Sequence, residues 1–394
     1  MINIAILGFG VVGSGVAEVI KENADSLSEK LCGQKLNVKY ILDKRSFPDH
    51  ELGDRVTMDY DMIVNDPEVV MVVETMGGSH PAYEFTKKAL LAGKNVVTSN
   101  KEVVANFGTE LLELARENNV NYLFEASVGG GIPIIRPMWQ CLAANKIESV
   151  TGILNGTTNF ILTKMIEENM SFDEALKIAQ SLGYAEANPA ADVEGLDTCR
   201  KICILASLAF GKTVSPENVH CEGITNITLS DVEAAEKLGY SIKLLGKAQA
   251  TEAGTYVITS PFLVGFENPM AGVNDGYNAI TVCGNAVGDV MFYGRGAGKL
   301  PTASAVVADI VDIARECKKA ITWTLSDTNP VIDYKSAKVR FFVRTPDASA
   351  KDLFPGCVFC DTDEGYAFIT DELPEAKLCE ILANIPVLSK IRVL

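Results

Sequence analysis

The chain has 394 residues, which predicts two or three domains at a typical size of about 150 residues each. Hydrophobic residues make up 47% of it and charged residues 22%, an ordinary globular composition that excludes a fibre, a collagen and a low-complexity tail. Its 35 basic and 51 acidic residues give a net charge of −16, so the overall field disfavours nucleic acid and anionic lipid surfaces as partners.

A short apolar strand is expected at residues 2–7, directly before a glycine-rich motif and a helical pattern at 12–21. The motif reads Gly8-Phe9-Gly10-Val11-Val12-Gly13. Its first glycine permits a tight turn, its second lets the backbone approach a pyrophosphate, and its third lets the helix pack on the strand. A purely structural turn is the alternative, but the strand–turn–helix context favours dinucleotide binding. The next strand, at 36–42, ends in Asp43-Lys44-Arg45, where the adenosine ribose should lie.

The following segments alternate between strand and helix, which predicts a doubly wound parallel sheet. Strands are expected at 69–73, 95–98 and 121–125, and helices at 82–92 and 102–118. Ligands bind beyond the carboxyl ends of the strands in such sheets. Three polar or glycine-rich strand ends are therefore expected to line one crevice, namely residues 74–78, 99–101 and 127–131.

Mixed helices and strands are expected after residue 132. Residues 152–160 are interpreted as a strand segment, and Ser171 with Glu174 as the capping box of a helix. Asp197 and Lys201 are four residues apart in an apolar helix that extends to about residue 210, so they share one helical face. An exposed ion pair is the ordinary interpretation. The apolar neighbours favour instead a partly buried lysine that can donate or accept a proton.

Further strands are expected at 256–264 and 279–282, followed by a glycine-rich stretch at 292–304 that opens a helix through residue 314. These glycines indicate either backbone that approaches a ligand or a simple loop. From about residue 330 onward a strand, a hairpin, a helix and a strand are expected at 338–344, around 363–365, at 374–383 and at 391–394. This order predicts a small α+β appendage.

Cysteines and histidines indicate little metal or thiol chemistry. Ten cysteines are scattered without framework spacing, which favours reduced thiols in a cytoplasmic protein. Cys357 and Cys360 form a CxxC pair, but no second pair or nearby histidine accompanies it, so we interpret it as a strand face. The three histidines, His50, His80 and His220, lie in no nucleophile or metal-ligand spacing, so lysine, aspartate or glutamate is expected to handle protons.

Several motifs occur together in an order that resembles the homoserine dehydrogenase family across roughly 310 residues. They are residues 8–13, Thr98-Ser-Asn-Lys101, residues 129–135, residues 152–160, Gly183-Tyr-Ala-Glu186 through Lys201, and residues 293–302. The resemblance implies a Rossmann-type NAD(P)-binding domain at 1–130 to which a helix at about 303–318 returns. It further implies an α+β catalytic and dimerisation domain at 131–320 and an ACT-like domain at 330–394. Because the nucleotide strand begins the chain, the monofunctional form is expected, without a fused aspartate kinase.

The implied reaction is the reversible reduction of L-aspartate 4-semialdehyde to L-homoserine by NAD(P)H, on the route to threonine and methionine. In the family, the lysine that matches Lys201 transfers the proton and the one that matches Lys101 lies close by. A cationic neighbour and burial would lower the pKa of Lys201 toward working pH. Lys44 and Arg45 favour the 2′-phosphate of NADP while Asp43 favours NAD, so both cofactors are expected to serve, with NADP at least as good.

Acidic residues that hold the substrate are implied by the same resemblance. The family's carboxylates match Glu186 and Asp197, with Asp192 as a secondary candidate, and they would face the substrate ammonium. Asn188 stands where the family usually has an acidic residue, so one negative charge is missing from this loop.

The resemblance also implies a sodium ion, further cofactor contacts and an oligomer. The main-chain oxygens of a sodium site match Glu125, Val128, Gly130 and Ile132. Gly183 and Gly296, in two of the shared motifs, are expected at the cofactor. A homodimer or homotetramer is expected.

Two alternatives remain, one with the same fold and one from another functional class. An aspartate semialdehyde dehydrogenase or another Rossmann-type amino-acid dehydrogenase shares the fold, but the former needs an activated cysteine nucleophile, and none of the ten cysteines lies in such a motif. A nonenzymatic NAD(P)-binding sensor would keep the glycine loop without a reason to keep Lys101, Glu186, Asp197 and Lys201. For the appendage, a reduced ACT-like domain without strong threonine inhibition is expected.

Overall fold

A computed structural model describes residues 1–315 and 321–394, and the chain folds into two compact units. The first unit comprises residues 1–146, 207–215 and 294–327, and the second comprises residues 147–206, 216–293 and 328–394. The chain therefore returns to the first unit twice. Residues 316–318 of the helix expected at 303–318, and Cys317 among the cysteines, lie outside the described residues.

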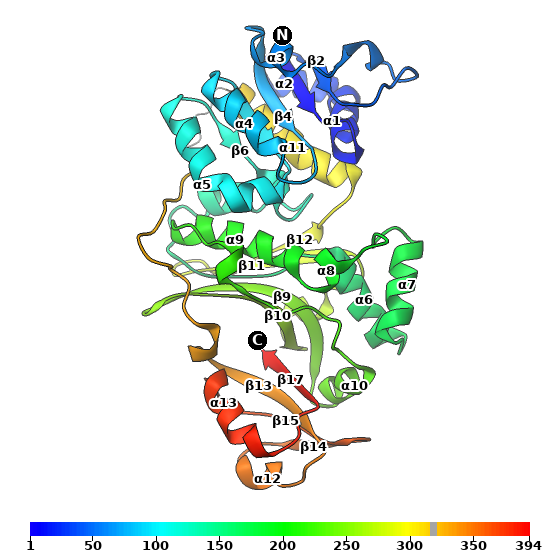
Figure 1. The fold of residues 1–394 in the computed structure, drawn as a ribbon, viewed down its shortest axis with the longest axis vertical. Helices are drawn as coiled ribbons and strands as arrows, with labels where there is room; N and C mark the ends of the chain where they lie inside the picture. Colours follow the sequence, from blue (N-terminus) through cyan, green and yellow to red (C-terminus); the bar gives the residue numbers. More distant parts are fainter. Residues whose placement is uncertain (316–320) are drawn as a thin grey trace. The chain divides into compact units, whose positions relative to one another are not determined.

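The first unit contains a parallel sheet in the order β3-β2-β1-β4-β5-β6, flanked by helices (Figure 1). Its strands are β1 (Ile2–Leu7), β2 (Leu36–Leu42), β3 (Val56–Thr57), β4 (Val69–Glu74), β5 (Asn95–Thr98) and β6 (Tyr122–Leu123). Its helices are α1 (Val11–Glu22), α2 (Ala24–Lys30), α3 (Tyr60–Val64), α4 (Ala82–Leu91), α5 (Lys101–Glu117) and α11 (Lys299–Ala314). This strand order is that of the dinucleotide-binding Rossmann fold, and ligands bind where the order reverses, beside β1.

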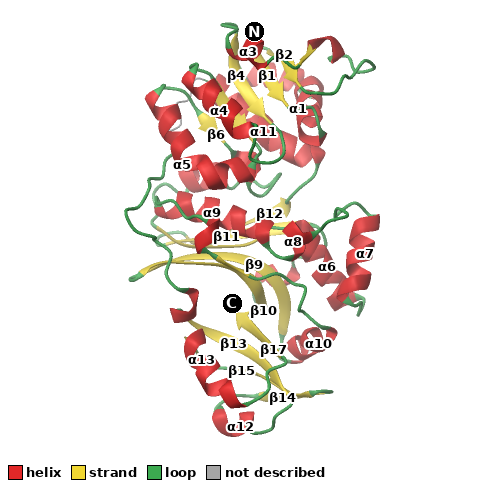
Figure 2. Cartoon of the chain, viewed as in Figure 1, coloured by secondary structure: helices red, strands yellow, loops and turns green. Residues whose placement is uncertain are grey.

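The second unit contains a larger mixed sheet in the order β12-β11-β7-β9-β10-β17-β13-β15-β14 (Figure 2). Five of its strands are β7 (Ile147–Ile153), β9 (Tyr240–Thr251), β10 (Gly254–Gly265), β11 (Tyr277–Gly284) and β12 (Gly288–Arg295), and the short β8 (His220–Cys221) pairs with β10. The helices of this part are α6 (Gly156–Glu167), α7 (Phe172–Ser181), α8 (Ala190–Val193), α9 (Leu196–Phe210) and α10 (Leu229–Lys237).

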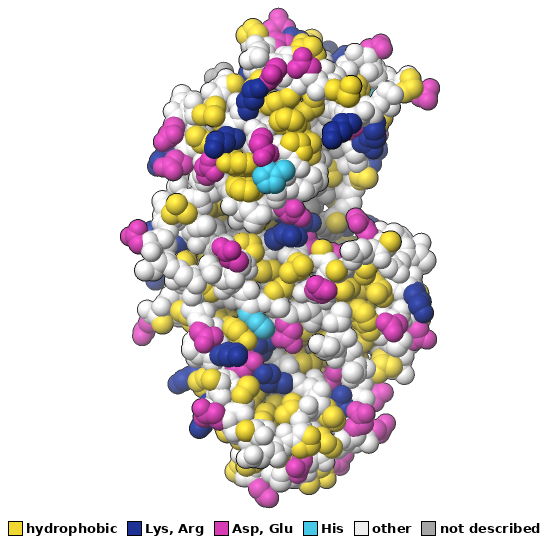
Figure 3. Space-filling model, viewed as in Figure 1, with side chains coloured by type: hydrophobic (Ala, Val, Ile, Leu, Met, Phe, Trp, Pro, Cys, Tyr) yellow, Lys and Arg dark blue, Asp and Glu magenta, His cyan; other side chains and the backbone are white. Residues whose placement is uncertain are grey.

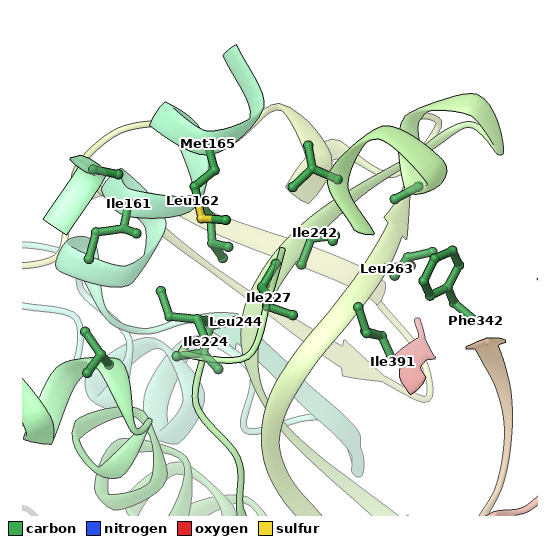
Figure 4. Close-up of a cluster of buried hydrophobic side chains, with 14 of the residues drawn as sticks. Ile161, Leu162, Met165, Ile224, Ile227, Ile242, Leu244, Leu263, Phe342 and Ile391 are labelled. Atoms are coloured by element: carbon green, nitrogen blue, oxygen red, sulfur yellow. The ribbon is translucent and has the colours of Figure 1, made fainter. Parts of the chain in front are cut away.

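A continuous apolar core fills the space between the sheet of the second unit and its helices (Figure 4). Side chains from α6, such as Ile161 and Leu162, meet Ile242 and Leu244 of β9 and Leu263 of β10. These five residues are at most 2% exposed. Burial of such side chains is the main favourable term in folding. It fixes α6 on one face of the sheet, and the N-terminus of α6 contributes to the site described below.

Residues 338–393 form a βαββαβ unit whose strands extend the same sheet. Its elements are β13 (Lys338–Thr345), α12 (Ala350–Leu353), β14 (Phe359–Thr362), β15 (Gly365–Ile369), α13 (Glu375–Ile381) and β17 (Ser389–Val393), with the short β16 (Leu373–Pro374) beside β13. Within this unit the fourth strand lies beside the first, then the third and the second, which is a ferredoxin-like arrangement. β17 also pairs in parallel with β10, through Phe262 with Arg392 and Leu263 with Val393.

One expectation about secondary structure was wrong. Residues 152–160 are not one strand segment, because β7 ends at Ile153 and α6 begins at Gly156. The side chain of Asn155 accepts a hydrogen bond from the backbone N–H of Thr158, and this N-cap starts the helix. The glycine-rich stretch at 292–304, for which two interpretations were open, begins on β12, which continues to Arg295, and ends on α11.

Candidate active site

Lys201 and Asp197 form a buried ion pair on α9. The Lys201 Nζ donates to Asp197 Oδ2 at 2.7 Å and to the main-chain oxygen of Leu154 at 2.7 Å. Lys201 is 8% exposed and Asp197 is 4% exposed, so the interpretation of an exposed ion pair does not hold. A buried charge is costly unless it is paired and hydrogen-bonded, and both of these contacts stabilise the ammonium form of the lysine.

Asn155 connects this pair to a second carboxylate. Its Nδ2 donates to Asp192 Oδ1 at 2.7 Å and to Asp197 Oδ2 at 2.9 Å. Asp192 lies on α8, so one amide joins α8 and α9 beside Lys201. In their ordinary ionisation states one ammonium and two carboxylates give this cluster a net charge of about −1, which suits a cationic group of a substrate.

Glu186 does not join the cluster of Lys201, Asp197, Asp192 and Asn155. Its side chain is exposed, and among the described residues it has no hydrogen bond or ion pair; only its main-chain oxygen accepts a bond, from Gln180 at 3.2 Å. Glu186 belongs to the stretch between α7 and α8 that also contains Gly183, at a left-handed φ of 77°. Glu186 therefore lies outside the hydrogen-bonded cluster in this structure.

Lys101 is the first residue of α5 in the first unit, and a polar network fixes this helix start. Asn100 caps α5 by accepting from the N–H groups of residues 102 and 103, and its amide donates to Gly78 O at 2.8 Å. Thr98 Oγ1 donates to Glu74 Oε2 at 2.5 Å. Burial raises the pKa of Glu74 to about 7. The ends of β4 and β5 thus meet next to Lys101, as expected for a site at the carboxyl ends of parallel strands.

The glycine motif after β1 forms an open cradle at the start of α1. Gly8 has a left-handed φ of 87°, and a Cβ at Gly13 would lie 2.0 Å from Gly8 O, so only glycine fits either position. A Cβ at Gly10, the N-cap residue, would meet no atom of the described residues within 4 Å, and this N-cap position makes no side-chain hydrogen bond to the helix. The motif therefore leaves room and free N–H groups for a pyrophosphate.

Asp43 and Arg45 form a compact pair after β2. Asp43 accepts from Phe9 N at 2.7 Å, and the Arg45 guanidinium donates to its two oxygens at 3.0 and 2.9 Å. The Arg45 hydrogen bond is the main cause of a pKa of Asp43 well below its usual range. Asp43 thus orients the backbone next to the cradle, while Arg45 compensates its charge and Lys44 is exposed.

We expect replacement of Arg45 by alanine to raise KM for NADP about 10-fold more than it raises KM for NAD. This factor corresponds to the loss of one hydrogen bond between charged groups. The variant removes the cation that can pair a 2′-phosphate, and it exposes the Asp43 carboxylate, which repels that phosphate. Initial rates with both cofactors measure the difference, with Lys30→Ala at the end of α2 as the control. An equal increase for NAD and NADP would contradict a phosphate contact.

The glycine-rich turn at 128–132 leaves main-chain oxygens available. The buried Glu125 carboxylate accepts from the N–H groups of residues 134, 135 and 136 at 2.6 to 2.9 Å, which fixes the turn from behind. Among the backbone hydrogen bonds of residues 1–315 and 321–394, none has the oxygen of Val128, Gly130 or Ile132 as acceptor. Hard oxygen atoms of this kind suit a monovalent cation.

A close backbone contact and an ion-pair cluster hold this turn. A Cβ at Gly130 would lie 2.4 Å from Gly296 O, so Gly130 and Gly296 approach each other as only glycine allows. Asp309 of α11 accepts from Glu125 N at 2.8 Å and pairs with Arg136 at 2.6 Å. Burial, and next the nearby Glu125 charge, raise the pKa of Asp309 to about 7.

Within the described ranges, no group of three His, Cys, Asp or Glu side chains could hold a metal ion. Cys357 and Cys360 are half-buried free thiols, and Cys360 lies on β14 while Cys357 precedes it. On the face drawn in Figure 3, basic side chains are scattered among acidic ones. No described helix is long and apolar enough to cross a bilayer.

Comparisons with known proteins agree on one family. Residues 8–125 match the family model "Homoserine dehydrogenase, NAD binding domain", and residues 133–311 match "Homoserine dehydrogenase". A homoserine dehydrogenase of Synechocystis is 44% identical over 340 residues, 84% of this chain and 76% of the relative, and that of Bacillus subtilis is 42% identical over 324 residues, 82% of this chain and 75% of the relative.

Solved structures lead to the same family. A homoserine dehydrogenase from Thiobacillus denitrificans superposes with a TM-score of 0.92 at 36% identity, covering 100% of this chain and 98% of that one. A hyperthermophilic archaeal homoserine dehydrogenase in complex with NADPH has a TM-score of 0.70 at 29% identity, covering 81% of this chain and 99% of that one.

Proposed function

Because the chain belongs to the homoserine dehydrogenase family, we propose that Lys201 transfers the proton in its reaction. The enzyme interconverts L-aspartate 4-semialdehyde and L-homoserine with NAD(P), on the route to threonine and methionine. The observation that supports the role of Lys201 is its burial together with its bonds to Asp197 and to the oxygen of Leu154.

The chemistry requires one hydride and one proton to move. When bound, the nicotinamide supplies the hydride donor or acceptor at its C4 atom. In the reducing direction, the Lys201 ammonium gives a proton to the alkoxide that forms at the aldehyde oxygen, and in the oxidising direction the neutral amine takes the proton of the homoserine hydroxyl. Lys101 supplies a second cation that stabilises the developing negative charge.

We propose that Asp197, Asp192 and Glu186 hold the substrate through its ammonium group. Asn155 joins two carboxylates, and their combined negative charge is larger than the single positive charge of Lys201. This excess negative charge supports a role in binding an ammonium group. Glu186, exposed on the loop before α8, can turn toward a substrate that arrives from solvent. Asn188, in the same loop, accepts from Ala190 N at 3.3 Å and so keeps a turn role without a charge.

The cofactor is held, in this proposal, by the glycine cradle from Gly8 to Gly13, by Asp43, Lys44 and Arg45 at the adenosine ribose, and by Lys101, Gly183 and Gly296. Sodium fits the turn at 128–132, because its main-chain oxygens are available and Glu125 holds it in place. The sodium ion would order this turn, which contacts the backbone at Gly296.

The proposed organisation has an NAD(P)-binding domain at 1–130, a catalytic domain at 131–320 and a C-terminal domain at 330–394. A homodimer or homotetramer is proposed for the assembly, and size-exclusion chromatography with light scattering determines it. The described cysteines are reduced thiols, which supports a cytoplasmic location, where thiols stay reduced.

Initial rates with homoserine and either NADP or NAD test the function directly. We expect turnover with both cofactors, with NADP at least as effective as NAD. Binding of NADPH without turnover of homoserine or aspartate 4-semialdehyde would contradict the enzymatic function.

The C-terminal domain at 330–394 is proposed to be a reduced relative of the ACT domain. Its βαββαβ order supports this, and its first helix, α12, has only four residues. An intact first helix presents free N–H groups to an amino-acid carboxylate at its N-terminus. Here Pro355 and Gly356 follow α12 and precede β14, so the short helix offers little of such a site.

We therefore expect millimolar threonine to leave the initial rate with homoserine almost unchanged. Because α12 is so short, a carboxylate gains few N–H partners there, and weak inhibition at most should result. Rates measured across a threonine titration at fixed, subsaturating homoserine check this, with serine as the control amino acid. Potent and cooperative inhibition by threonine alone would show that the unit retains a ligand site.

A further inference from the structure

The side chain of Asn155 bonds at both ends. Its Oδ1 accepts from Thr158 N at 2.9 Å, which caps α6, and its Nδ2 donates to Asp192 at 2.7 Å and to Asp197 at 2.9 Å. The residue is 5% exposed. An N-cap requires only the oxygen, and serine or aspartate would serve as well there. The Nδ2 contacts therefore exceed what the helix start needs.

Two consecutive residues hold the buried ion pair. The main-chain oxygen of Leu154 accepts from Lys201 Nζ, and the side chain of Asn155 donates to Asp197 Oδ2, the same oxygen that accepts from Lys201. The Asp197 oxygen thus has two donors. The core shown in Figure 4 holds α6, and β7 is held by its pairing with β9 and β11, so residues 154 and 155 lie between two fixed elements.

We propose that Asn155 is a positioning residue of the reaction, which sets the orientation of the Asp197 carboxylate against Lys201 and holds Asp192 beside them. This inference rests on the proposed role of Lys201. Both amide hydrogens are directed to carboxylates that would otherwise repel each other across α8 and α9. Small errors in the placement of a reacting group lower the reaction rate strongly. Loss of this bridge should therefore lower kcat more than it lowers the stability of the fold.

Two variants of Asn155 separate positioning from capping. Asn155→Ser keeps an N-cap oxygen but has no amide to reach the carboxylates. Asn155→Asp keeps an equally good cap and the same shape, but it places a third carboxylate where the amide bridged two. A role in capping alone predicts that the aspartate variant behaves like the wild type. Positioning predicts that the aspartate variant is the most impaired.

We expect kcat with homoserine to fall about 10-fold in Asn155→Ser and further in Asn155→Asp, while KM for NADP stays within about two-fold in both. Ser171→Ala, which removes the capping box of α7, is the matched control: it should lower the melting temperature with little effect on kcat. Wild-type kcat in Asn155→Asp, or losses that follow only the melting temperatures, would overturn the inference.

Lys201→Met measured alongside distinguishes this inference from the proposed function. Near-normal turnover of a folded Lys201→Met protein would refute the role of Lys201 itself. Strong loss in Lys201→Met together with unchanged kcat in both Asn155 variants would refute the positioning role alone.

Discussion

Replacing Lys201 by methionine is expected to lower kcat for homoserine oxidation by about 100-fold or more, the usual worth of a positioned acid or base. Methionine keeps most of the length and the apolar contacts of the lysine stem but has no proton to exchange. The Asp197 carboxylate loses one of its donors but keeps Asn155 at 2.9 Å, so the variant should still fold. Stopped assays in both directions, with circular dichroism to verify the fold, measure the effect.

Two further substitutions make this experiment specific. Lys201→Arg keeps the positive charge beside Asp197 but cannot release a proton at working pH, so it should be nearly as inactive as the methionine variant. Lys164→Met, on α6, removes a partly exposed surface ion pair with Glu168 and should change kcat by less than about two-fold. A folded Lys201→Met protein that turns over at nearly the normal rate would refute the assignment.

Replacing Asp197 by asparagine is expected to lower kcat/KM for homoserine by about 100-fold while leaving NADPH binding nearly unchanged. The change removes a buried charge that faces Lys201, and breaking one side of a buried pair leaves the other uncompensated. The amide variant of Glu186 should reduce kcat/KM less, because this side chain is exposed and bonded to no described residue. Steady-state kinetics give both values.

The affinity for NADPH decides whether these two carboxylates act on the substrate. Fluorescence titration should give dissociation constants for Asp197→Asn and Glu186→Gln within about three-fold of the wild type, since the cofactor contacts proposed above do not include either side chain. Glu174→Gln, at the start of α7, is the control for a lost surface carboxylate. A collapse of NADPH affinity in either variant would show that these residues serve the cofactor instead.

The local patterns of the first unit could be interpreted from the sequence alone. Buried parallel strands are rich in apolar residues, as β4 is, and the bounds of β2 and β5 are those predicted, residues 36–42 and 95–98. The pairing of Asp197 with Lys201 was also predictable from a local pattern, because residues four apart in a helix lie on the same face.

Long-range contacts were beyond the sequence patterns. Asn155 contacts Asp192 and Asp197, which are 37 and 42 residues away, so no local spacing identifies it as a bridge. A local signal was present, since an asparagine before Gly156 and two threonines is typical of a helix start, yet the strand interpretation of residues 152–160 concealed it. The contact of Arg45 with Asp43 is local, only two residues along the chain, but it depends on side-chain rotamers, which the residue types alone do not determine.

The position of β17 has a consequence for synthesis of the protein. This strand lies between β10 and β13. Residues 389–393, near the end of the chain, therefore join β10 to the strands of the C-terminal region in one sheet. Until the ribosome has added those residues, β8 pairs part of β10, but the part at Phe262 and Leu263 lacks its partner strand and is an edge that other chains can join. We infer that this edge must be protected from other chains during translation. Deletion of residues 389–393 should therefore cause the protein to aggregate, rather than only unfold its C-terminal region.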